Sequence, residues 1–356
     1  MSDSNIGGEA SILEERRRKL EDLRELNLAY LNNFTPANKA QELHDSHGQL
    51  SKEELEDKTI TNLSVAGRIV LKRVMGNASF VTIRDGSGDI QAYITKNNID
   101  PDLYKNFKSW DLGDIIGITG KLFKTKTEEL TVEAHSIILI TKSLRPMPEK
   151  HKGLVDIEIK YRQRYLDLMS SPESKEIFIK RSQIVSSIRA SMLADDFLEV
   201  ETPMMHSIPG GAVAKPFITK HNALDRELFL RIAPELYLKR LLVGGFDKVF
   251  EINRSFRNEG LSTRHNPEFT MLEFYAAFAS FNGTIDFTKS IIQSASEAIG
   301  NNDQIEWDGD KIDLSHFSIK TLNDLVLEHN PDLSVDDLTS LDKLRSYSKT
   351  INLSYK

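Results

Sequence analysis

The most informative part of this sequence runs Phe250-Glu251-Ile252-Asn253-Arg254-Ser255-Phe256-Arg257-Asn258-Glu259-Gly260 and resumes at Arg264-His265-Asn266-Pro267-Glu268-Phe269-Thr270-Met271-Leu272-Glu273. Apolar and polar residues alternate in both segments, and a short polar stretch separates them, which predicts two strands joined as a hairpin. Side chains two positions apart share one face of a strand. We therefore expect Arg257 and Glu259 on one face of the first strand, and Phe269, Met271 and Glu273 on one face of the second.

The predicted face of this hairpin combines three kinds of side chain that suit a nucleotide. Arginine can bind phosphate through two hydrogen bonds, a carboxylate can accept from the exocyclic amine of a base, and an aromatic ring can stack on a purine. Any one of these residues alone is better explained by an exposed hairpin with salt bridges. Taken together, they indicate a nucleotide-binding site.

The segments around the hairpin predict a domain of mixed helix and strand. Apolar stretches at 228–232, 248–253 and 268–275 predict strands. Residues 173–196 predict a long amphipathic helix with one apolar side formed by Ile177, Ile184, Val185, Ile188 and Met192. Upstream, the prolines of Leu144-Arg145-Pro146-Met147-Pro148 interrupt both periods, since proline restricts its own backbone and that of the residue before it. A linker there separates two domains.

The region before this linker, residues 61–141, predicts about five short strands with one helical insert near Leu103 to Trp110. Turn signals recur between the strands, as expected for a small barrel of the OB type. Phe80 and Tyr93 lie in strands near Arg73, Arg84 and Gln91, and single-stranded RNA is bound by such combinations of aromatic and hydrogen-bonding side chains. An aromatic residue in a strand is, however, more often part of a core.

The first 60 residues predict helices. Leu13, Leu20, Leu23 and Leu26 recur at helical spacing through the basic run Arg16-Arg17-Arg18-Lys19. This run fits a solvated helix face, or else contact with an RNA backbone. Residues 34–58 are polar and predict a linker or helical connector.

Composition narrows the classes of function. The chain has 356 residues, a net charge of −7 and no cysteine, so disulfides, a thiolate nucleophile and Cys-ligated zinc are excluded. No apolar run approaches the roughly 18 residues of a membrane helix, and the first residues lack a signal-peptide pattern. We expect a cytoplasmic protein with no membrane partner, and the negative charge argues against indiscriminate binding of polyanions.

The run from Phe256 to Glu273 resembles the second signature of the class II aminoacyl-tRNA synthetases, and Phe197-Leu198-Glu199-Val200-Glu201-Thr202-Pro203 resembles their first. Three further runs resemble the bacterial lysyl-tRNA synthetases within that class: Ile208 to Ala212, Arg231 to Arg240, and Tyr161-Arg162-Gln163-Arg164-Tyr165-Leu166-Asp167-Leu168. The resemblance implies an α+β multidomain fold. An N-terminal helical extension and connector (1–60) would precede an OB-fold anticodon-binding domain (61–145) and an antiparallel-sheet catalytic domain (146–356).

The resemblance also implies roles for individual residues. Arg257 would be the catalytic residue, contacting the ATP α-phosphate and the lysine carboxylate, while Glu259, His265, Asn266 and Phe269 would bind the rest of ATP. Lysine would place its α-amino group against Glu235 and the backbone of Gly211, and its ε-ammonium against Glu273 and Tyr275. The anticodon of tRNA(Lys) would be bound by Arg73, Phe80, Gln91 and Glu129. The first signature implies a homodimer.

One departure from the family pattern concerns the C-terminal part of the catalytic domain. Members carry there a Gly-rich strand and helix with an ATP-binding arginine, preceded by acidic Mg²⁺ ligands, and nothing after Gly309 resembles either. We therefore expect a truncated catalytic domain without metal ligands, and almost no lysine-dependent exchange of pyrophosphate into ATP.

Other functions remain open. The main alternative is a truncated, non-catalytic tRNA-binding or regulatory product of the same family. A synthetase-like enzyme that transfers lysine to a protein is less favoured, because such relatives lack the barrel. An aspartate or asparagine enzyme should offer a cation to the substrate side chain, whereas Glu273 offers an anion.

Overall fold

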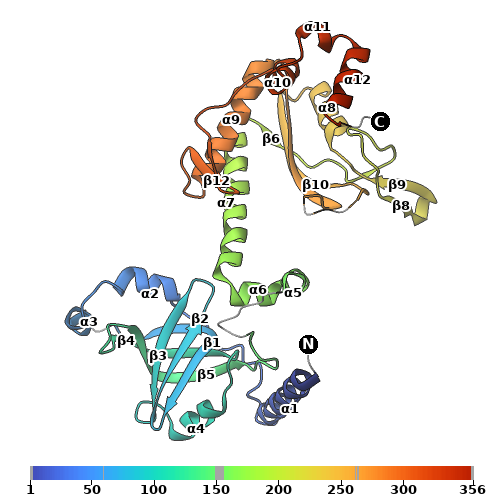
Figure 1. Ribbon diagram of the computed structural model, residues 1–356. Helices are drawn as coiled ribbons and strands as arrows, with labels where there is room; N and C mark the ends of the chain where they lie inside the picture. Colours follow the sequence, from blue (N-terminus) through green and yellow to red (C-terminus); the bar gives the residue numbers. More distant parts are fainter. Residues whose placement is uncertain (1–2, 59, 149–155, 261, 263, 354–356) are drawn as a thin grey trace. The chain divides into compact units, whose positions relative to one another are not determined.

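The computed structural model describes residues 3–58, 60–148, 156–260, 262 and 264–353, and the chain forms two compact units, Met1–Ser171 and Pro172–Lys356 (Figure 1). The first unit contains α1 (Asp3–Glu25), α2 (Ala40–His47), α3 (Lys52–Lys58), β1 (Leu63–Met75), β2 (Ala78–Arg84), β3 (Asp89–Thr95), α4 (Pro101–Ser109), β4 (Ile115–Lys124), β5 (Leu130–Thr141), α5 (Ile157–Arg162) and α6 (Arg164–Ser170).

The second unit begins with the long helix α7. Its elements are α7 (Pro172–Ala194), β6 (Leu198–Glu199), β7 (Met205–His206), β8 (Ile218–His221), the 3-10 helix η1 (Asn222–Leu224), β9 (Arg226–Leu230), α8 (Glu235–Val243), β10 (Lys248–Phe256), β11 (Glu268–Ala276), α9 (Phe281–Glu297), β12 (Gln304–Trp307), β13 (Asp310–Asp313), α10 (Leu322–His329), α11 (Val335–Leu338) and α12 (Leu341–Thr350). In the described part of the chain, no helix combines the length and apolar character needed to cross a membrane.

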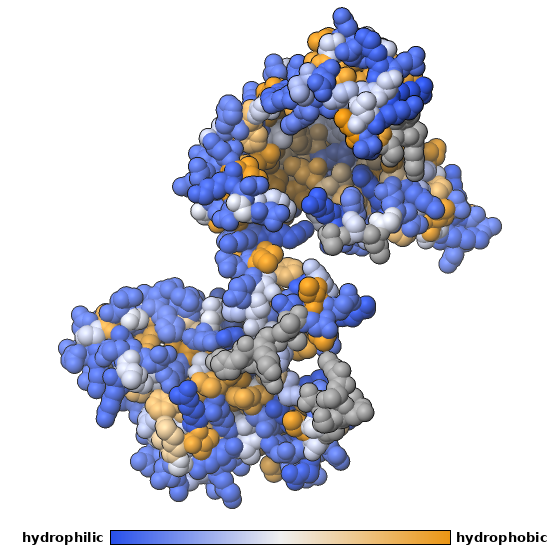
Figure 2. All heavy atoms as spheres, viewed as in Figure 1, coloured by the Kyte–Doolittle hydropathy of each residue, from blue (hydrophilic) through white to orange (hydrophobic). Residues whose placement is uncertain are grey.

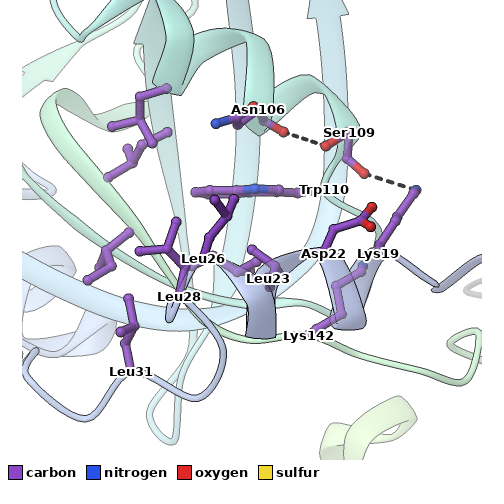
Figure 3. A pocket seen from close by; sticks show the side chains of 14 residues that line it. Lys19, Asp22, Leu23, Leu26, Leu28, Leu31, Asn106, Ser109, Trp110 and Lys142 are labelled. Carbon is purple, nitrogen blue, oxygen red and sulfur yellow. Dashed lines mark hydrogen bonds between the residues drawn. The ribbon is translucent and has the colours of Figure 1, made fainter. Parts of the chain in front are cut away.

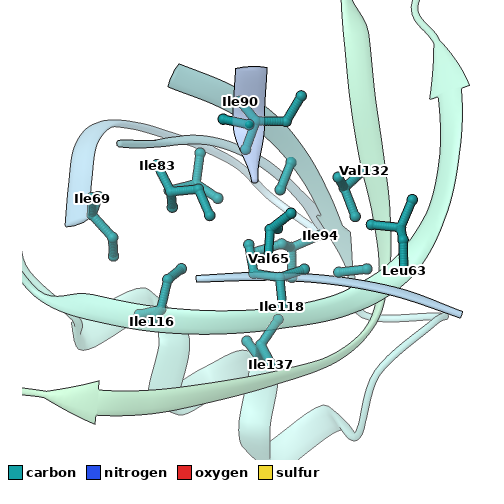
Figure 4. Packing of buried hydrophobic residues seen from close by; sticks show 14 of the residues in the cluster. Leu63, Val65, Ile69, Ile83, Ile90, Ile94, Ile116, Ile118, Val132 and Ile137 are labelled. Atoms are coloured by element: carbon teal, nitrogen blue, oxygen red, sulfur yellow. The ribbon is translucent and has the colours of Figure 1, made fainter. Parts of the chain in front are cut away.

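The predicted barrel is present and closed, with strand order β1-β2-β3-β5-β4. Each strand directs alternate side chains inward, so that β2 and β3 show a strict alternation of buried and half-buried residues. The interior consists of branched aliphatic side chains (Figure 4), among them Val65, Ile83, Ile90, Ile94, Ile118 and Val132. The expected helical insert is α4, whose N-cap residue Asp100 accepts hydrogen bonds from two backbone N–H groups.

Helix α1 is bound to the barrel through its basic run. The Arg16 guanidinium is buried and donates to the carbonyl oxygens of Ser143 (3.2 Å) and Arg145 (2.9 Å), just after β5. Lys19 donates to the carbonyl of Ser109 at the C-terminal end of α4 (Figure 3). It also donates to Asp111, two residues after that helix. Two of the four basic residues, Arg16 and Lys19, therefore hold α1 on the barrel, whereas Arg17 and Arg18 are exposed. Neither a solvated face nor contact with RNA, the two interpretations of the sequence, anticipated this structural role.

The second unit is built on the sheet β11-β10-β6. Strands β10 and β11 pair antiparallel, as the hairpin prediction requires, while the short β6 adds a parallel pair beside β10. One face of this sheet is apolar and packs on α7 and α9 through a core that contains Met192, Phe197, Phe250 and Ile291. The other face carries polar side chains and contributes no residue to this core.

Two sequence expectations for the second unit need correction. Strand β10 ends at Phe256, so Arg257 and Glu259 lie in the following loop and not on the strand itself. Only part of the expected apolar side of α7 is buried, because Met192 is buried but Ile177 is 66% exposed. The apolar contacts of the helix with the core beside the sheet come from Ile188 and Met192, in its C-terminal half.

Candidate active site and nucleic-acid surface

The polar face of the β10–β11 hairpin gathers most of the predicted active-site residues. Glu251 pairs with Glu273 and Ser255 with Phe269 in the antiparallel register. Directly paired residues project on the same side of a sheet, so Phe269, Met271, Glu273 and Tyr275 share this face with Glu251 and Ser255. Figure 2 shows a hollow in the second unit with hydrophobic and hydrophilic residues in its wall.

Arg257 reaches this face from the loop after β10. Its backbone N–H donates to the carbonyl of Pro267 at 2.9 Å, which extends the hairpin pairing past the end of the strand. The Cζ atom of Arg257 lies 5.1 Å from the centre of the Phe269 ring, a cation–π distance. Its Nε is buried and has no hydrogen-bond partner in the described structure. The structure thus brings Arg257 and Phe269 together and leaves a donor available.

The remaining predicted ATP ligands lie in the exposed loop between the strands. Glu259, His265 and Asn266 are all exposed. The Nδ1 of His265 is 2.8 Å from the Ser262 hydroxyl, a hydrogen bond within the loop. These three side chains are near the hairpin in sequence, but in the described structure they are not gathered against Arg257 and Phe269.

Glu273 and Tyr275 form a carboxylate pocket. The Tyr275 hydroxyl donates to Oε1 of Glu273 at 2.7 Å, and Oε2 of Glu273 is buried without a hydrogen-bond partner in the part of the chain that is described. Burial raises the pKa of Glu273, and the negative charges of Glu235 and Glu251 raise it further. Burial and the bond to Glu273 also raise the pKa of Tyr275, so this hydroxyl keeps its proton.

Helix α8 brings Glu235 to the same pocket. Glu235 forms a 2.5 Å ion pair with Lys239 one turn later, and the Lys239 ammonium lies 5.7 Å from the centre of the Tyr275 ring. Gly211 adjoins Glu235 at a backbone φ of +88°, and a Cβ at this position would be 3.0 Å from the Cβ of Glu235. Glycine is therefore required both by conformation and by space.

A buried ion pair beneath the pocket was not predicted from the sequence. Arg231 and Glu251 have side chains that are 0% and 1% exposed and lie 2.7 Å apart. Thr202 donates to Glu251 through its hydroxyl at 2.6 Å, and Asn253 donates to the same carboxylate at 2.8 Å. Strand alternation in the sequence could have placed Glu251 on the polar face of β10, but it gives no sign of Arg231, which follows β9 in a different sheet.

The predicted anticodon residues lie on the outside of the barrel. Arg73 pairs with Phe80, Phe80 with Tyr93, and Gln91 with Thr131, so that their side chains cross β1, β2, β3 and β5 in two adjacent rows. The Phe80 and Tyr93 rings have centres 4.9 Å apart. These rings are half-buried and outside the aliphatic core, and Glu129 is exposed in the turn before β5. The surface has the aromatic and hydrogen-bonding groups that unpaired bases require.

A divalent metal ion has no suitable group of ligands within the described ranges of the chain. No three His, Asp or Glu side chains there are close enough to hold one. The expectation that the Mg²⁺ ligands of the family are missing from this chain stays a prediction, and no chemical step below involves a metal bound by these residues.

Comparison with known proteins assigns both units. A family profile described as class II tRNA synthetases for Asp, Lys and Asn matches residues 156–343, and one described as an OB-fold nucleic-acid-binding domain matches residues 63–140. The division of the chain at residues 60 and 145 stays a prediction.

Several bacterial proteins named lysine–tRNA ligase are similar to the chain along nearly all of its length. The protein from Methylobacillus flagellatus is 53% identical over 96% of this chain and 67% of its own length. The protein from Thiobacillus denitrificans is 50% identical over 98% of this chain and 70% of its own length. A Neisseria meningitidis protein is 51% identical over 95% of this chain and 67% of its own length. The chain spans about two thirds of the length of these relatives. With both domain matches, this shows that the chain belongs to the lysine–tRNA ligases, a family of class II aminoacyl-tRNA synthetases.

Proposed function

We propose that the polar face of β10 and β11 binds lysine and ATP for the formation of lysyl-adenylate, and that the barrel binds tRNA(Lys), the acceptor of the lysyl group. The observation that carries this proposal is the carboxylate pocket. In the described part of the chain, one oxygen of Glu273 is buried without a hydrogen-bond partner, on the same face as Phe269, whose ring contacts Arg257. Because translation takes place there, we place the protein in the cytoplasm.

The pocket is suited to the two amino groups of lysine. The ε-ammonium can donate to Oε2 of Glu273 and contact Tyr275, since a buried carboxylate needs a donor or a cation. The α-amino group is assigned to Glu235 and the backbone of Gly211, which are adjacent to each other. An aspartate or an asparagine enzyme would present a cation to the substrate side chain, and the unpartnered group here is an anion.

ATP is assigned to Arg257, Phe269 and the loop between the strands. Phe269 offers a ring to adenine, and Arg257 offers an N–H that is unpartnered among the described residues to the α-phosphate. Glu259, His265 and Asn266, which are exposed in the loop between the strands, are assigned to the rest of ATP. An arginine between the α-phosphate and the lysine carboxylate neutralises charge as the carboxylate attacks phosphorus and pyrophosphate leaves. Mg²⁺ would supply further charge neutralisation on the phosphates when bound.

The anticodon is assigned to Arg73, Phe80, Gln91 and Glu129, with a base stacked on Phe80. A homodimer through the segment after α7 is part of the same proposal. This segment exposes apolar side chains, since Leu198 is 46% and Met205 56% exposed. Exposed apolar groups that cluster on one segment favour an interface between proteins.

Lysine specificity is tested by thermal unfolding of this chain with lysine or norleucine, which has nearly the same shape but no ε-amine. Lysine should raise the melting temperature and norleucine should raise it much less. Equal shifts at matched saturation would contradict the assignment of the pocket to lysine.

The alternative function is tested by two measurements on the same preparation. Lysine-dependent exchange of pyrophosphate into ATP by this chain would establish the catalytic function. Binding of tRNA(Lys) with no exchange would favour the non-catalytic tRNA-binding product. Our expectation from the sequence, almost no exchange, stays a prediction.

A further inference from the structure

The arginine that acts on Glu273 is hydrogen-bonded to other groups. Arg231 is fully buried beside Glu251, the residue that pairs with Glu273 across the hairpin, and its positive charge acts to lower the pKa of Glu273. Yet its Nη1 donates to Glu251 at 2.7 Å and its Nε to the carbonyl of Arg254 at 2.7 Å. A longer bond of 3.2 Å joins Nη1 to the Thr202 hydroxyl. Its Nη2 has no partner in the described structure.

Glu251 is the group that holds Arg231 in this position. Besides Arg231, it accepts from the Thr202 hydroxyl at 2.6 Å, the Thr202 N–H at 3.2 Å and the Asn253 amide at 2.8 Å. Both of its oxygens are therefore satisfied. Glu251 is also the residue paired with Glu273 across the hairpin, so the buried carboxylate of Glu251 and the half-buried side chain of Glu273 are neighbours on one face.

The two carboxylates are treated differently by their surroundings. Among the described residues, Glu251 accepts from four donors, whereas Glu273 accepts only from the Tyr275 hydroxyl, on Oε1. In the same part of the chain, Nη2 of Arg231 and Oε2 of Glu273 are buried and have no hydrogen-bond partner. A buried donor and a buried acceptor each lose free energy when they remain unpaired. The absence of a hydrogen bond between Arg231 and Glu273 is explained if Glu251 holds the Arg231 guanidinium in place.

We propose that Glu251 is a specificity-determining positioning residue, which holds Arg231 so that the Glu273 carboxylate stays available for the ammonium group of the substrate. The inference rests on the proposed binding of lysine in the same pocket. The other charged groups that act on Glu273 are accounted for, because Glu235 is an anion and is paired with Lys239. Without the charge of Glu251, Arg231 becomes an uncompensated cation that pairs with Glu273 and competes with lysine.

The inference is tested by binding titrations of lysine and norleucine to the full chain and its variants. Glu251→Gln should reduce the ratio of lysine to norleucine affinity at least tenfold, mainly through weaker binding of lysine. Arg231→Gln combined with Glu251→Gln removes the competing cation together with its partner. This double variant should regain the lysine preference to within about threefold of the unmodified chain, because a buried ion pair can often be replaced as a unit.

A purely structural role of the ion pair predicts a different result, in which the double variant is no better than Glu251→Gln. That result, or an unchanged preference in Glu251→Gln, would overturn the inference. The matched control is Glu268→Gln, which neutralises an exposed carboxylate on β11 away from the pocket and should leave the preference unchanged.

Two further results are informative. If Glu251→Gln does not fold, Thr202→Val removes the 2.6 Å bond to Glu251 and should lower the lysine preference by a smaller factor, while no loss would count against the proposal. If the unmodified chain shows no preference for lysine over norleucine, the proposed function itself is wrong. The experiment therefore distinguishes an error in the role of Glu251 from an error in the proposed binding of lysine.

Discussion

The Tyr275 hydroxyl donates a 2.7 Å hydrogen bond to Glu273, two residues earlier on the same strand. The bond orients the carboxylate and occupies only one of its oxygens, and the other, Oε2, is buried and has no hydrogen-bond partner among the described residues. Because the pKa of Tyr275 is raised, this hydroxyl keeps its proton and stays neutral.

Lysine binding should depend on pH through Glu273. Burial raises the pKa of this carboxyl above its ordinary value of 4.5, so protonation begins at a higher pH than for an exposed glutamate. As the pH falls from 7 toward 4.5, lysine affinity should decrease, and Glu273→Gln should bind lysine weakly with little dependence on pH. Calorimetric titrations at several pH values measure both. Equal pH profiles of the two proteins would contradict this role.

The same pKa predicts the effect of Glu273 on folding without ligand. A carboxyl with a raised pKa in the folded state lowers the unfolding free energy as pH rises from its ordinary pKa through the raised one. Glu273→Gln should therefore be more stable relative to the unmodified chain at pH 7 than at pH 4. Denaturant unfolding at the two pH values gives this difference directly, and a difference of the opposite sign would argue against burial of the ionised group.

Arg257 should contribute to ATP binding more than its neighbour Arg254. A charged hydrogen bond contributes about 1.5 to 3 kcal/mol, so Arg257→Ala should weaken ATP binding by roughly tenfold or more. Arg254 is exposed and paired with Glu268 at 2.5 Å, and Arg254→Ala should leave ATP affinity nearly unchanged. A fluorescence titration with ATP distinguishes the two. Similar losses in both variants would show that overall charge, and not position, governs binding.

Gly211→Ala should damage the lysine pocket locally. Its φ of +88° is unfavourable for alanine, and the new Cβ would crowd Glu235 at 3.0 Å. We expect a loss of about 1 to 3 kcal/mol in stability together with weaker lysine binding. Gly245→Ala introduces similar strain at a φ of +103° with nothing within 4 Å, so it should lower stability but not lysine affinity. Melting temperatures and lysine titrations test the pair.

Phe80→Ala should weaken binding of a uridine-rich anticodon stem-loop to the whole chain by about 1 to 3 kcal/mol, the contribution of one stacked base. Tyr30→Ala removes another aromatic ring of the same unit, one that is 54% exposed, and serves as the control. Equal affinities of Phe80→Ala and the unmodified chain would place the RNA elsewhere.

The alternation of residues in β11 was sufficient to predict that Phe269, Met271 and Glu273 share one face, because strand periodicity is local and fixed. The end of β10 was not predictable in the same way. The backbone N–H of Arg257 still donates to the carbonyl of Pro267 across the hairpin, although β10 has ended. The sequence around Arg257 therefore has the pattern of a strand.

Contacts between distant segments account for the other failures. Nothing local to Glu251 indicates that Arg231 lies against it, since Glu251 is in β10 and Arg231 follows β9, a strand of another sheet. Likewise, the basic run of α1 has the pattern of a solvated surface, and only its packing on the residues after β5 reveals that Arg16 is buried. Charged residues are the least predictable here, because their burial depends on a partner far away in the sequence.

The anchoring of α1 limits how the RNA-binding half can be dissected. A fragment starting at residue 61 would lose both cations that α1 supplies to Asp111 and would uncover apolar barrel surface beneath Leu20 and Leu23. It would also lose Phe34, which lies so close to Gly117 of β4 that a Cβ there would be 2.7 Å from its ring. Weak RNA binding by such a fragment would therefore report a damaged scaffold, and a minimal RNA-binding piece has to begin upstream of Arg16.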